Sequence, residues 1–297
     1  MSAALTWRPA PVPTDGAAPD ATRMDTVELL VGDLDAQTAF YRDAVSLEIL
    51  DQSGSRATLG RNGIPIVHLT NAPGRAPFDR GGAGLYHTAI AFPDRRALSA
   101  AVMSMARRAG DTYEGATDHT FSNAFYFHDP EGNGIELYWD LPTDVWQDKP
   151  AGWMPRNTAI DPNAFLREHF DPAGASTGEA TVGHVHLQVG DIPTARRFYV
   201  DLLGFDVTID LGTALFVSAG GYHHHIGMNT WHSAGAGPRA VSLGLGDVRL
   251  RVPERDDVLA LADRARHAGV DVQDDGAGVR LRDPWGTLLT VLPEGSD

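Results

Sequence analysis

Three consecutive histidines stand out in the stretch GGYHHHIGMNTW at residues 220–231. The chain holds 12 histidines and no cysteine, so a bound metal must be held by imidazole and carboxylate groups rather than by thiolates. Imidazoles also exchange protons near neutral pH. The triplet therefore indicates a metal site or an acid/base group, with a patch of surface histidines as the plain alternative. In a strand, His223 and His225 would lie on one face and His224 on the other.

Other histidines and a glutamate recur in strand-like segments. His87 lies in GLYHTAI, Glu136 in GIELYWD, and His184 and His186 in GHVHLQVGD. His186 shares a face with His184, so it either supports that residue or lines the same site. The pair DH at residues 118–119 is either a loop cap or an acid/base pair, and His119 is retained as a catalytic candidate.

Composition limits the class of partner. The 297 residues are 42% hydrophobic, enough for a large core or for two ordinary domains. The formal net charge is −15, and no basic clusters occur, which argues against nucleic acid or a membrane as partner and favours a small molecule. Because neither a long apolar run nor a secretory signal is found, we expect a cytoplasmic protein.

These residues are carried by a repeated unit. TVELLVGDLDAQTAFYRDAVSLEIL and HVHLQVGDIPTARRFYVDLLGFDVT share a strand, the letters VGD and a helix ending in Phe-Tyr. Each half divides again, and its second part closes with Asp-Pro-x-Gly, a turn sequence. The pattern predicts four βαβββ units that begin near Thr26, Gly84, Gly183 and Gly244.

We therefore predict an α+β fold of four such units. The expected divisions are a disordered tail at 1–22, a first pair of units at 23–140, a linker at 141–180 and a second pair at 181–297. Trp146, Trp153 and Phe165 suggest that the linker packs against the protein.

With these motifs, and with DPEGNGIELYWD before the last strand of unit two, the chain resembles the vicinal oxygen chelate superfamily. Within it, the histidine segments look like the two-domain catechol 2,3-dioxygenase family, over about residues 24–293. The resemblance implies two cups of strands, each built from two units. It also implies a metal held by residues of the first and last strands of the two units that share a cup.

Carried over, these positions depend on which units pair. They are Thr26 and His68 in unit one, His87 and Glu136 in unit two, His184 and His225 in unit three, and Asp247 and Thr290 in unit four. Sequential pairing leaves a weak threonine ligand in each cup. Pairing unit two with unit three collects His87, Glu136, His184 and His225 in one cup, and this arrangement is favoured.

The resemblance implies a non-heme Fe(II) extradiol dioxygenase acting on an aromatic diol and O2. Two histidines and one carboxylate are typical of such iron sites; Mn(II), Ni(II) and Zn(II) are alternatives. If His225 is not a ligand, it serves with His223 as acid/base. If it is a ligand, a glyoxalase-type isomerase or lyase is the better interpretation. A non-catalytic binder of aromatic compounds is a third hypothesis, and homo-oligomer formation stays open. Tyr138 and Trp231 are candidates for the pocket wall.

Overall fold

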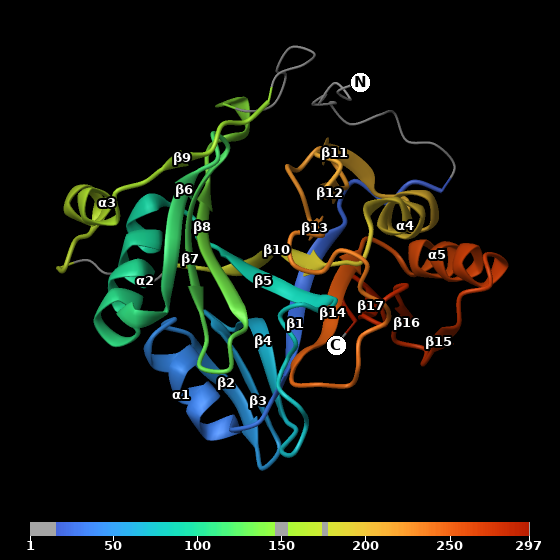
Figure 1. Cartoon of the computed structure of the whole chain (residues 1–297), viewed down its shortest axis with the longest axis horizontal. Coiled ribbons are helices and arrows are strands. Elements are labelled where there is room, and N and C mark those ends of the chain that lie inside the picture. Colours follow the sequence, from blue (N-terminus) through green and yellow to red (C-terminus); the bar gives the residue numbers. More distant parts are fainter. Residues whose placement is uncertain (1–15, 146–153, 174–177, 297) are drawn as a thin grey trace.

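The computed structural model describes residues 16–145, 154–173 and 178–296. Two large sheets form its centre, and in Figure 1 helices α1 and α2 lie at one end of the molecule and α4 and α5 at the other. None of the helices described is long and apolar enough to cross a membrane. Residues 1–15 of the expected tail, together with Trp146 and Trp153 of the linker, lie outside the described residues.

The second and third units form one nine-stranded sheet. At its middle β10 and β5 run antiparallel, with His186 opposite His87. In sheet order the strands are β11 (Asp206–Asp210), β12 (Ala214–Ser218), β13 (Ile226–Asn229), β10 (Thr181–Gln188), β5 (Gly84–Ala91), β8 (Gly134–Asp140), β7 (Ser122–His128), β6 (Tyr113–Asp118) and β9 (Thr158–Ala159).

The first and fourth units form the other sheet, of eight strands, in which β1 and β14 run antiparallel. In sheet order these are β15 (Val272–Asp274), β16 (Val279–Arg282), β17 (Leu288–Pro293), β14 (Gly244–Val252), β1 (Arg23–Val31), β4 (Ile64–Asn71), β3 (Arg56–Arg61) and β2 (Glu48–Ser53). The units thus pair two with three and one with four, the arrangement that gathers the strong ligands in one cup.

The aspartates of the repeated VGD letters start helices. The side chains of Asp33 and Asp191 accept hydrogen bonds from the backbone N–H groups of Ala36 and Thr194, each satisfying a donor that a helix start leaves unpaired. The helices are α1 (Leu34–Asp43), α2 (Arg95–Arg108), α3 (Pro162–His169), α4 (Ile192–Arg196), which continues as a π-helical segment, η3 (Arg197–Leu202), and α5 (Arg255–His267), with short 3-10 turns η1 (Gly110–Thr112) and η2 (Thr143–Val145).

The tyrosine of each repeated Phe-Tyr pair forms a hydrogen bond to the following unit. The hydroxyl of Tyr41 donates to Asp129 at 3.3 Å, and that of Tyr199 donates to Asp283 at 3.0 Å. Both aspartates belong to the Asp-Pro-x-Gly turns of the following unit. Units one and two, and units three and four, are therefore joined by a buried hydrogen bond although their strands belong to different sheets.

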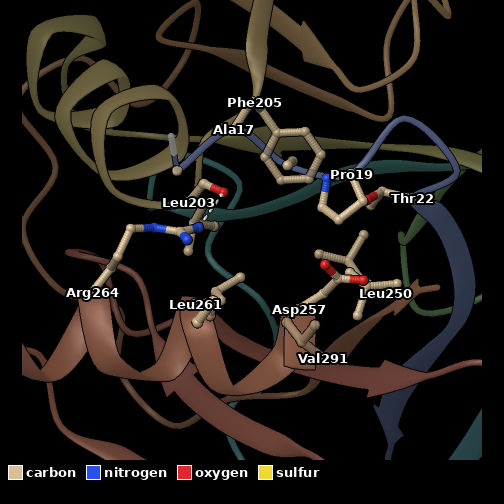
Figure 2. A pocket seen from close by; sticks show the side chains of 14 residues that line it. Ala17, Pro19, Thr22, Leu203, Phe205, Leu250, Asp257, Leu261, Arg264 and Val291 are labelled. Atoms are coloured by element: carbon tan, nitrogen blue, oxygen red, sulfur yellow. Dashed lines mark hydrogen bonds between the residues drawn. The ribbon is translucent and has the colours of Figure 1, made fainter. Parts of the chain in front are cut away.

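Residues 16–22, expected in the disordered tail, pack against the body of the protein. The N–H of Ala18 donates to the carbonyl of Gly204 at 2.8 Å. Gly204 has φ +86°, and a Cβ there would lie 2.2 Å from the carbonyl oxygen of Gly16, so a larger residue does not fit. Figure 2 shows the cavity of about 200 Å³ that lies between this segment and α5, with Phe205 and Leu261 among its mainly apolar walls.

The described part of the linker packs as well. Phe165 of α3 is buried, and its ring centroid lies 4.8 Å from that of Phe125, a core residue on β7. Strand β9 pairs with β6 and so extends the sheet of units two and three. The linker thereby comes to lie beside the cup formed by these units.

Candidate metal centre

Three predicted ligands meet on the inner face of the nine-stranded sheet. One ligand atom each from His87, Glu136 and His184 lies within 4.8 Å of the others, and all three side chains are buried. The Nε2 atoms of His87 and His184 lie 2.9 and 3.1 Å from the same carboxylate oxygen, Oε2 of Glu136. This is the largest concentration of metal-ligating chemistry that the described residues contain.

Neighbouring strands position the three ligands. His184, His87 and Glu136 come from β10, β5 and β8, which follow one another in the sheet. Ala89 on β5 pairs with His184 on one side and with Glu136 on the other, and it is fully buried. Such an arrangement joins residues of both halves of the chain in one site.

The buried atoms of this group fit a cation. Within the described chain His87 Nε2 has no hydrogen-bond partner, although Glu136 lies near it. Burial favours the neutral carboxyl of Glu136, but His184 and His87 outweigh it and hold its pKa well below its usual range. Burial lowers the pKa of His184, against the opposing charge of Glu136. An ionised carboxylate is the state in which Glu136 can bind a divalent metal.

A cavity of about 480 Å³ opens beside the three ligands. Its walls come from both units and from the linker, which contributes Met154, Pro155 and Asn157. Its aromatic walls are Tyr86, Phe121, Tyr126, Phe127, Phe216 and Trp231. A partly apolar hollow with a few polar groups is typical of a small-molecule site.

Two predicted wall residues have different places. Trp231 lines the cavity and is 48% exposed at its mouth. Tyr138 is fully buried and does not line the cavity; its ring centroid lies 5.0 Å from that of His184, and a Cβ on Gly183 would overlap its hydroxyl. His186 lines the cavity beside the ligands, and its Nε2 lies 3.0 Å from the side-chain amide of Asn229.

In the histidine triplet, His224 rather than the expected His225 lies at the cavity. Residues 223–225 lie between a turn at Gly220 and Gly221, which both have positive φ, and β13. The backbone of His225 is already hydrogen-bonded to Val217 of β12 and Val185 of β10. It is His224 that lines the cavity, with its ring centroid 4.1 Å from that of His184.

His225, expected as a fourth ligand or as a base, is not brought to the ligand group. Its Nδ1 accepts a hydrogen bond from the backbone N–H of Ala219 at 3.2 Å, and its ring lies against Tyr222. Burial, then the charges of His223 and His184, lower its pKa to about 3. The backbone hydrogen bonds of His225 to Val217 and Val185 fix this placement, and His225 does not line the cavity.

His223 connects His224 to a carboxylate. Its Nδ1 lies 2.8 Å from Nδ1 of His224, and its Nε2 lies 2.7 Å from Oδ1 of Asp140. Tyr222 donates to the other oxygen of Asp140 at 2.7 Å. His223 is thus fully buried behind the cavity, and Asp140 at the end of β8 was not singled out from the sequence. Asp140 lies four residues after Glu136 on the same strand, so strand alternation predicts that both side chains lie on one face; this pattern could have identified it.

His119 also lines the cavity. Its Nδ1 lies 2.8 Å from Oδ1 of Asn157, and its Nε2 lies 2.7 Å from the hydroxyl of Tyr126. Burial first, then the charge of Glu136, raises the pKa of Tyr126 well above its usual range, so the hydroxyl keeps its proton. The neighbouring Asp118 caps the loop by accepting from the N–H of Thr120. Asp118 is thus the loop cap that the sequence allowed for.

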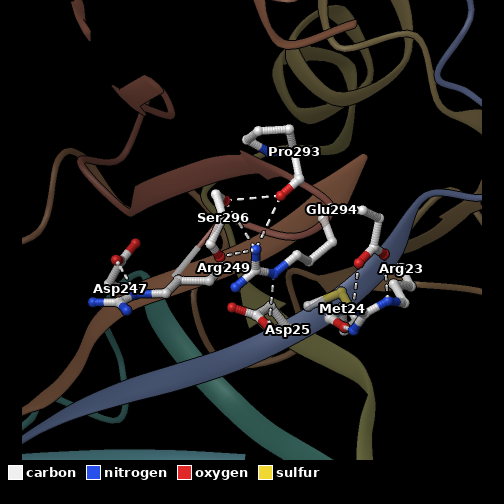
Figure 3. A network of polar contacts seen from close by, with 9 residues as sticks. Arg23, Met24, Asp25, Asp247, Arg249, Pro293, Glu294 and Ser296 are labelled. Atoms are coloured by element: carbon white, nitrogen blue, oxygen red, sulfur yellow. Dashed lines mark hydrogen bonds and ion pairs between the residues drawn. The ribbon is translucent and has the colours of Figure 1, made fainter. Parts of the chain in front are cut away.

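The other cup holds its polar groups differently. Asp247 accepts from Thr290 at 2.8 Å and from Arg249 at 3.0 Å, while His68 pairs with Thr58. Figure 3 shows Arg249 beside Asp247, next to the contacts that join β1 to the carboxyl-terminal segment. Among the residues described, this cup contains no group of three side chains placed to hold a metal. The guanidinium of Arg249 is the cation that Asp247 meets there.

Comparisons with known proteins agree with this architecture. A family model described as Glyoxalase/Bleomycin resistance protein/Dioxygenase superfamily matches residues 23–137 and 181–291. The chain is 34% identical over 279 residues to a catechol-2,3-dioxygenase of Bacillus subtilis (strain 168), and the alignment covers 91% of this chain and 97% of that protein.

Solved structures share the fold at low identity. A candidate dioxygenase from Bacillus subtilis subsp. subtilis str. 168 matches with a TM-score of 0.62 and 15% identity, over 92% of this chain and 85% of that one. Glyoxalase I from Zea mays matches with a TM-score of 0.57 and 16% identity, over 92% of both chains. These likenesses concern the fold alone, and they include proteins of more than one chemistry.

Proposed function

The chain belongs to the glyoxalase/bleomycin resistance protein/dioxygenase superfamily, and we propose that it is a non-heme Fe(II)-dependent extradiol dioxygenase of a catechol-like aromatic diol. The observation that carries the proposal is the convergence of His87, Glu136 and His184 in a buried group beside a cavity. The identity to a catechol-2,3-dioxygenase over nearly the whole chain supports the reaction type.

His87, Glu136 and His184 would hold the metal. Two histidines and one carboxylate form the ligand set associated with Fe(II) oxygenases. Bound there, iron would supply redox chemistry and open coordination positions for the two oxygens of a catechol. The side chains around it would orient the ring and manage its protons.

His224 is proposed as the base that takes a proton from the diol. A carboxylate only accepts hydrogen bonds, so Asp140 fixes the proton of His223 on Nε2. The remaining Nδ1 of His223 then accepts the Nδ1 proton of His224. Nε2 of His224 is left with its lone pair, and a base of this kind is suited to a hydroxyl whose acidity a nearby cation raises.

His119 and Tyr126 form a second proton-carrying pair on another wall. Asn157 Oδ1 accepts the Nδ1 proton of His119, so Nε2 of His119 accepts from the hydroxyl of Tyr126. Tyr126 also lies beside Glu136, whose charge acts on its pKa. We propose that the hydroxyl oxygen of Tyr126 accepts a hydrogen bond from the bound substrate and that His119 holds this oxygen in place.

The glyoxalase-type alternative is less well supported. In its expected form it uses a fourth protein ligand, and His225 is engaged with the backbone of Ala219 instead. The non-catalytic binder is disfavoured because a buried group of two imidazoles and one carboxylate has little use in a site that only surrounds an apolar ring.

The test is to load the protein anaerobically with Fe(II), add catechol, and follow oxygen uptake and the absorbance of the yellow ring-opened product. We expect one O2 consumed per ring opened, since both oxygen atoms enter the product. Glu136→Gln is the matched control, because it keeps the side-chain size and removes the charged ligand. Isomerisation of a hemithioacetal by wild-type protein without oxygen uptake would contradict the proposal.

A further inference from the structure

We infer that the cavity selects catechols whose ring substituent is uncharged and apolar, and that it discriminates against catechols bearing a carboxylate. This inference rests on the proposed function, because it names the substrate class of the same site. It is carried by two features of the cavity wall, its charge and its apolar surface.

The charged groups of the wall are acidic. None of the described residues that line the cavity is an arginine or a lysine. Glu114 lies on the wall, where it pairs with His128 at 3.1 Å; Glu136 also lines the cavity, but the bound cation would offset its charge. A formal charge of −15 over the whole chain adds an unfavourable field for an approaching anion.

The apolar part of the wall is one continuous cluster. Phe121 and Ile209 are buried, and Met154 and Phe216 pack against them. All four line the cavity, and Leu211, 41% exposed, continues this surface at the mouth. At about 480 Å³ the cavity has room for more than a bare ring, so a substituent would extend along this cluster.

A carboxylate placed against such a surface loses its water and meets no guanidinium or ammonium group among the described residues of the wall. Burying an unpaired charge is much less favourable than burying a neutral group of the same shape. A methyl, alkyl or ester substituent instead removes apolar area from water. The difference should reduce binding of the acid by on the order of 100-fold relative to a neutral analogue.

The test compares three related ligands, one charged and two neutral: 3,4-dihydroxybenzoate, its primary amide, which has nearly the same size, and its slightly larger methyl ester. Each is titrated anaerobically into the Fe(II)-loaded protein by calorimetry, and kcat/KM is then measured in air. We expect the ester and the amide to bind at least about 30-fold more tightly than the acid. Binding of the acid within threefold of the ester would overturn the inference.

A pair of variants tests the role of charge directly. Leu211→Arg places a cation at the exposed mouth, and Leu211→Gln is the uncharged control of similar length. We expect Leu211→Arg to reduce the preference for ester over acid by about tenfold relative to Leu211→Gln. Equal preferences in the two variants would show that shape rather than charge sets selection, and would overturn the inference.

The outcomes separate this inference from the proposed function. If ester and acid are both cleaved with similar efficiency, the dioxygenase proposal stands and the selectivity is wrong. If the ester binds and the acid does not, while no catechol consumes oxygen, the selectivity stands and the dioxygenase proposal is wrong.

Discussion

Nδ1 of His223 and Nδ1 of His224 lie 2.8 Å apart, so two adjacent imidazoles share one proton. Which ring holds that proton is decided on the far side of His223, where Nε2 meets Asp140 at 2.7 Å. The carboxylate therefore sets the tautomer of a residue that it does not touch. Asp140 is a positioning residue in this arrangement, and His224 is the residue at the cavity.

Replacing Asp140 by Asn should impair turnover more than substrate binding. An amide can donate a hydrogen bond to His223 Nε2, which would reverse both tautomers and place a proton on His224 Nε2. We expect kcat to fall by roughly 10²–10⁴-fold, with anaerobic catechol affinity changed by less than about tenfold. The measurement is kcat and KM from oxygen uptake, beside a calorimetric titration.

Tyr222→Phe serves as the control for this change. It removes the other partner of Asp140 and leaves the contact with His223 in place. If Tyr222→Phe lowers kcat as strongly as Asp140→Asn, loss of local order rather than the tautomer explains both, and the positioning role of Asp140 is refuted.

Single substitutions in the histidine triplet should separate chemistry from stability. His224→Gln removes the base at the cavity, and we expect kcat to fall by roughly 10²–10⁴-fold with little change in the free energy of unfolding. His225→Gln should keep most of the activity and lower the free energy of unfolding by about 1–3 kcal/mol, because a buried partner of Ala219 is altered. Steady-state kinetics and urea unfolding measure the two effects. If His225→Gln lowers kcat strongly and His224→Gln does not, His225 is the functional histidine and the proposed role of His224 is wrong.

The three metal ligands could be predicted from the sequence, whereas the histidine of the triplet that faces the cavity could not. The repeat places His87 and His184 at the equivalent position in the first strands of units two and three, the resemblance adds Glu136 in the last strand of unit two, and strand geometry then brings the three together. His223 to His225 lie outside any regular strand, between the turn at Gly220 and Gly221 and the start of β13, so no extended periodic pattern fixes which ring faces the cavity.

Local sequence patterns also cannot predict which units share a sheet. Sequential and crossed pairing give the same helices and strands, and only the chemistry of the collected ligands favoured the crossed one. Tyr126 and Asp140 were missed because single polar residues on strands are common, and their roles depend on contacts with His119 and His223 that are distant in sequence.

Metal content should be one ion per chain. The cup of units two and three contains the ligand group, whereas Asp247 is already paired with Arg249 and Thr290. Elemental analysis after Fe(II) or Zn(II) loading and dialysis should give about one equivalent. Glu136→Gln should lose more affinity than the roughly 10–100-fold that loss of an outer hydrogen bond costs.

Asp247→Asn is the matched change in the other cup. It alters the same kind of buried carboxylate and should leave metal content and dioxygenase activity unchanged. If the metal content per chain falls in Asp247→Asn but not in Glu136→Gln, the metal lies in the cup of units one and four, and the proposed site is refuted.

The stability of the metal-free protein should fall in acid in a way that His225 partly determines. Burial, then the charges of His223 and His184, lower the pKa of His225 to about 3, whereas an unfolded histidine has a pKa of about 6.5. Between these values the unfolded chain binds a proton that the folded chain does not. The contribution to stability is therefore complete above about pH 6.5 and is lost as pH falls toward 3.

His225→Gln isolates this contribution from those of other groups. Burial raises the pKa of Asp129 and Asp283, and such carboxyls act in the opposite direction, so the total pH dependence alone is not diagnostic. Between pH 7.5 and pH 5 the wild-type protein should lose about 2 kcal/mol more unfolding free energy than His225→Gln. Urea unfolding of both proteins at the two pH values, in the presence of a chelator, measures the difference. Parallel losses would mean that His225 takes up its proton in the folded state, as an exposed imidazole does, and the turn at residues 220–225 would then have to be open in solution.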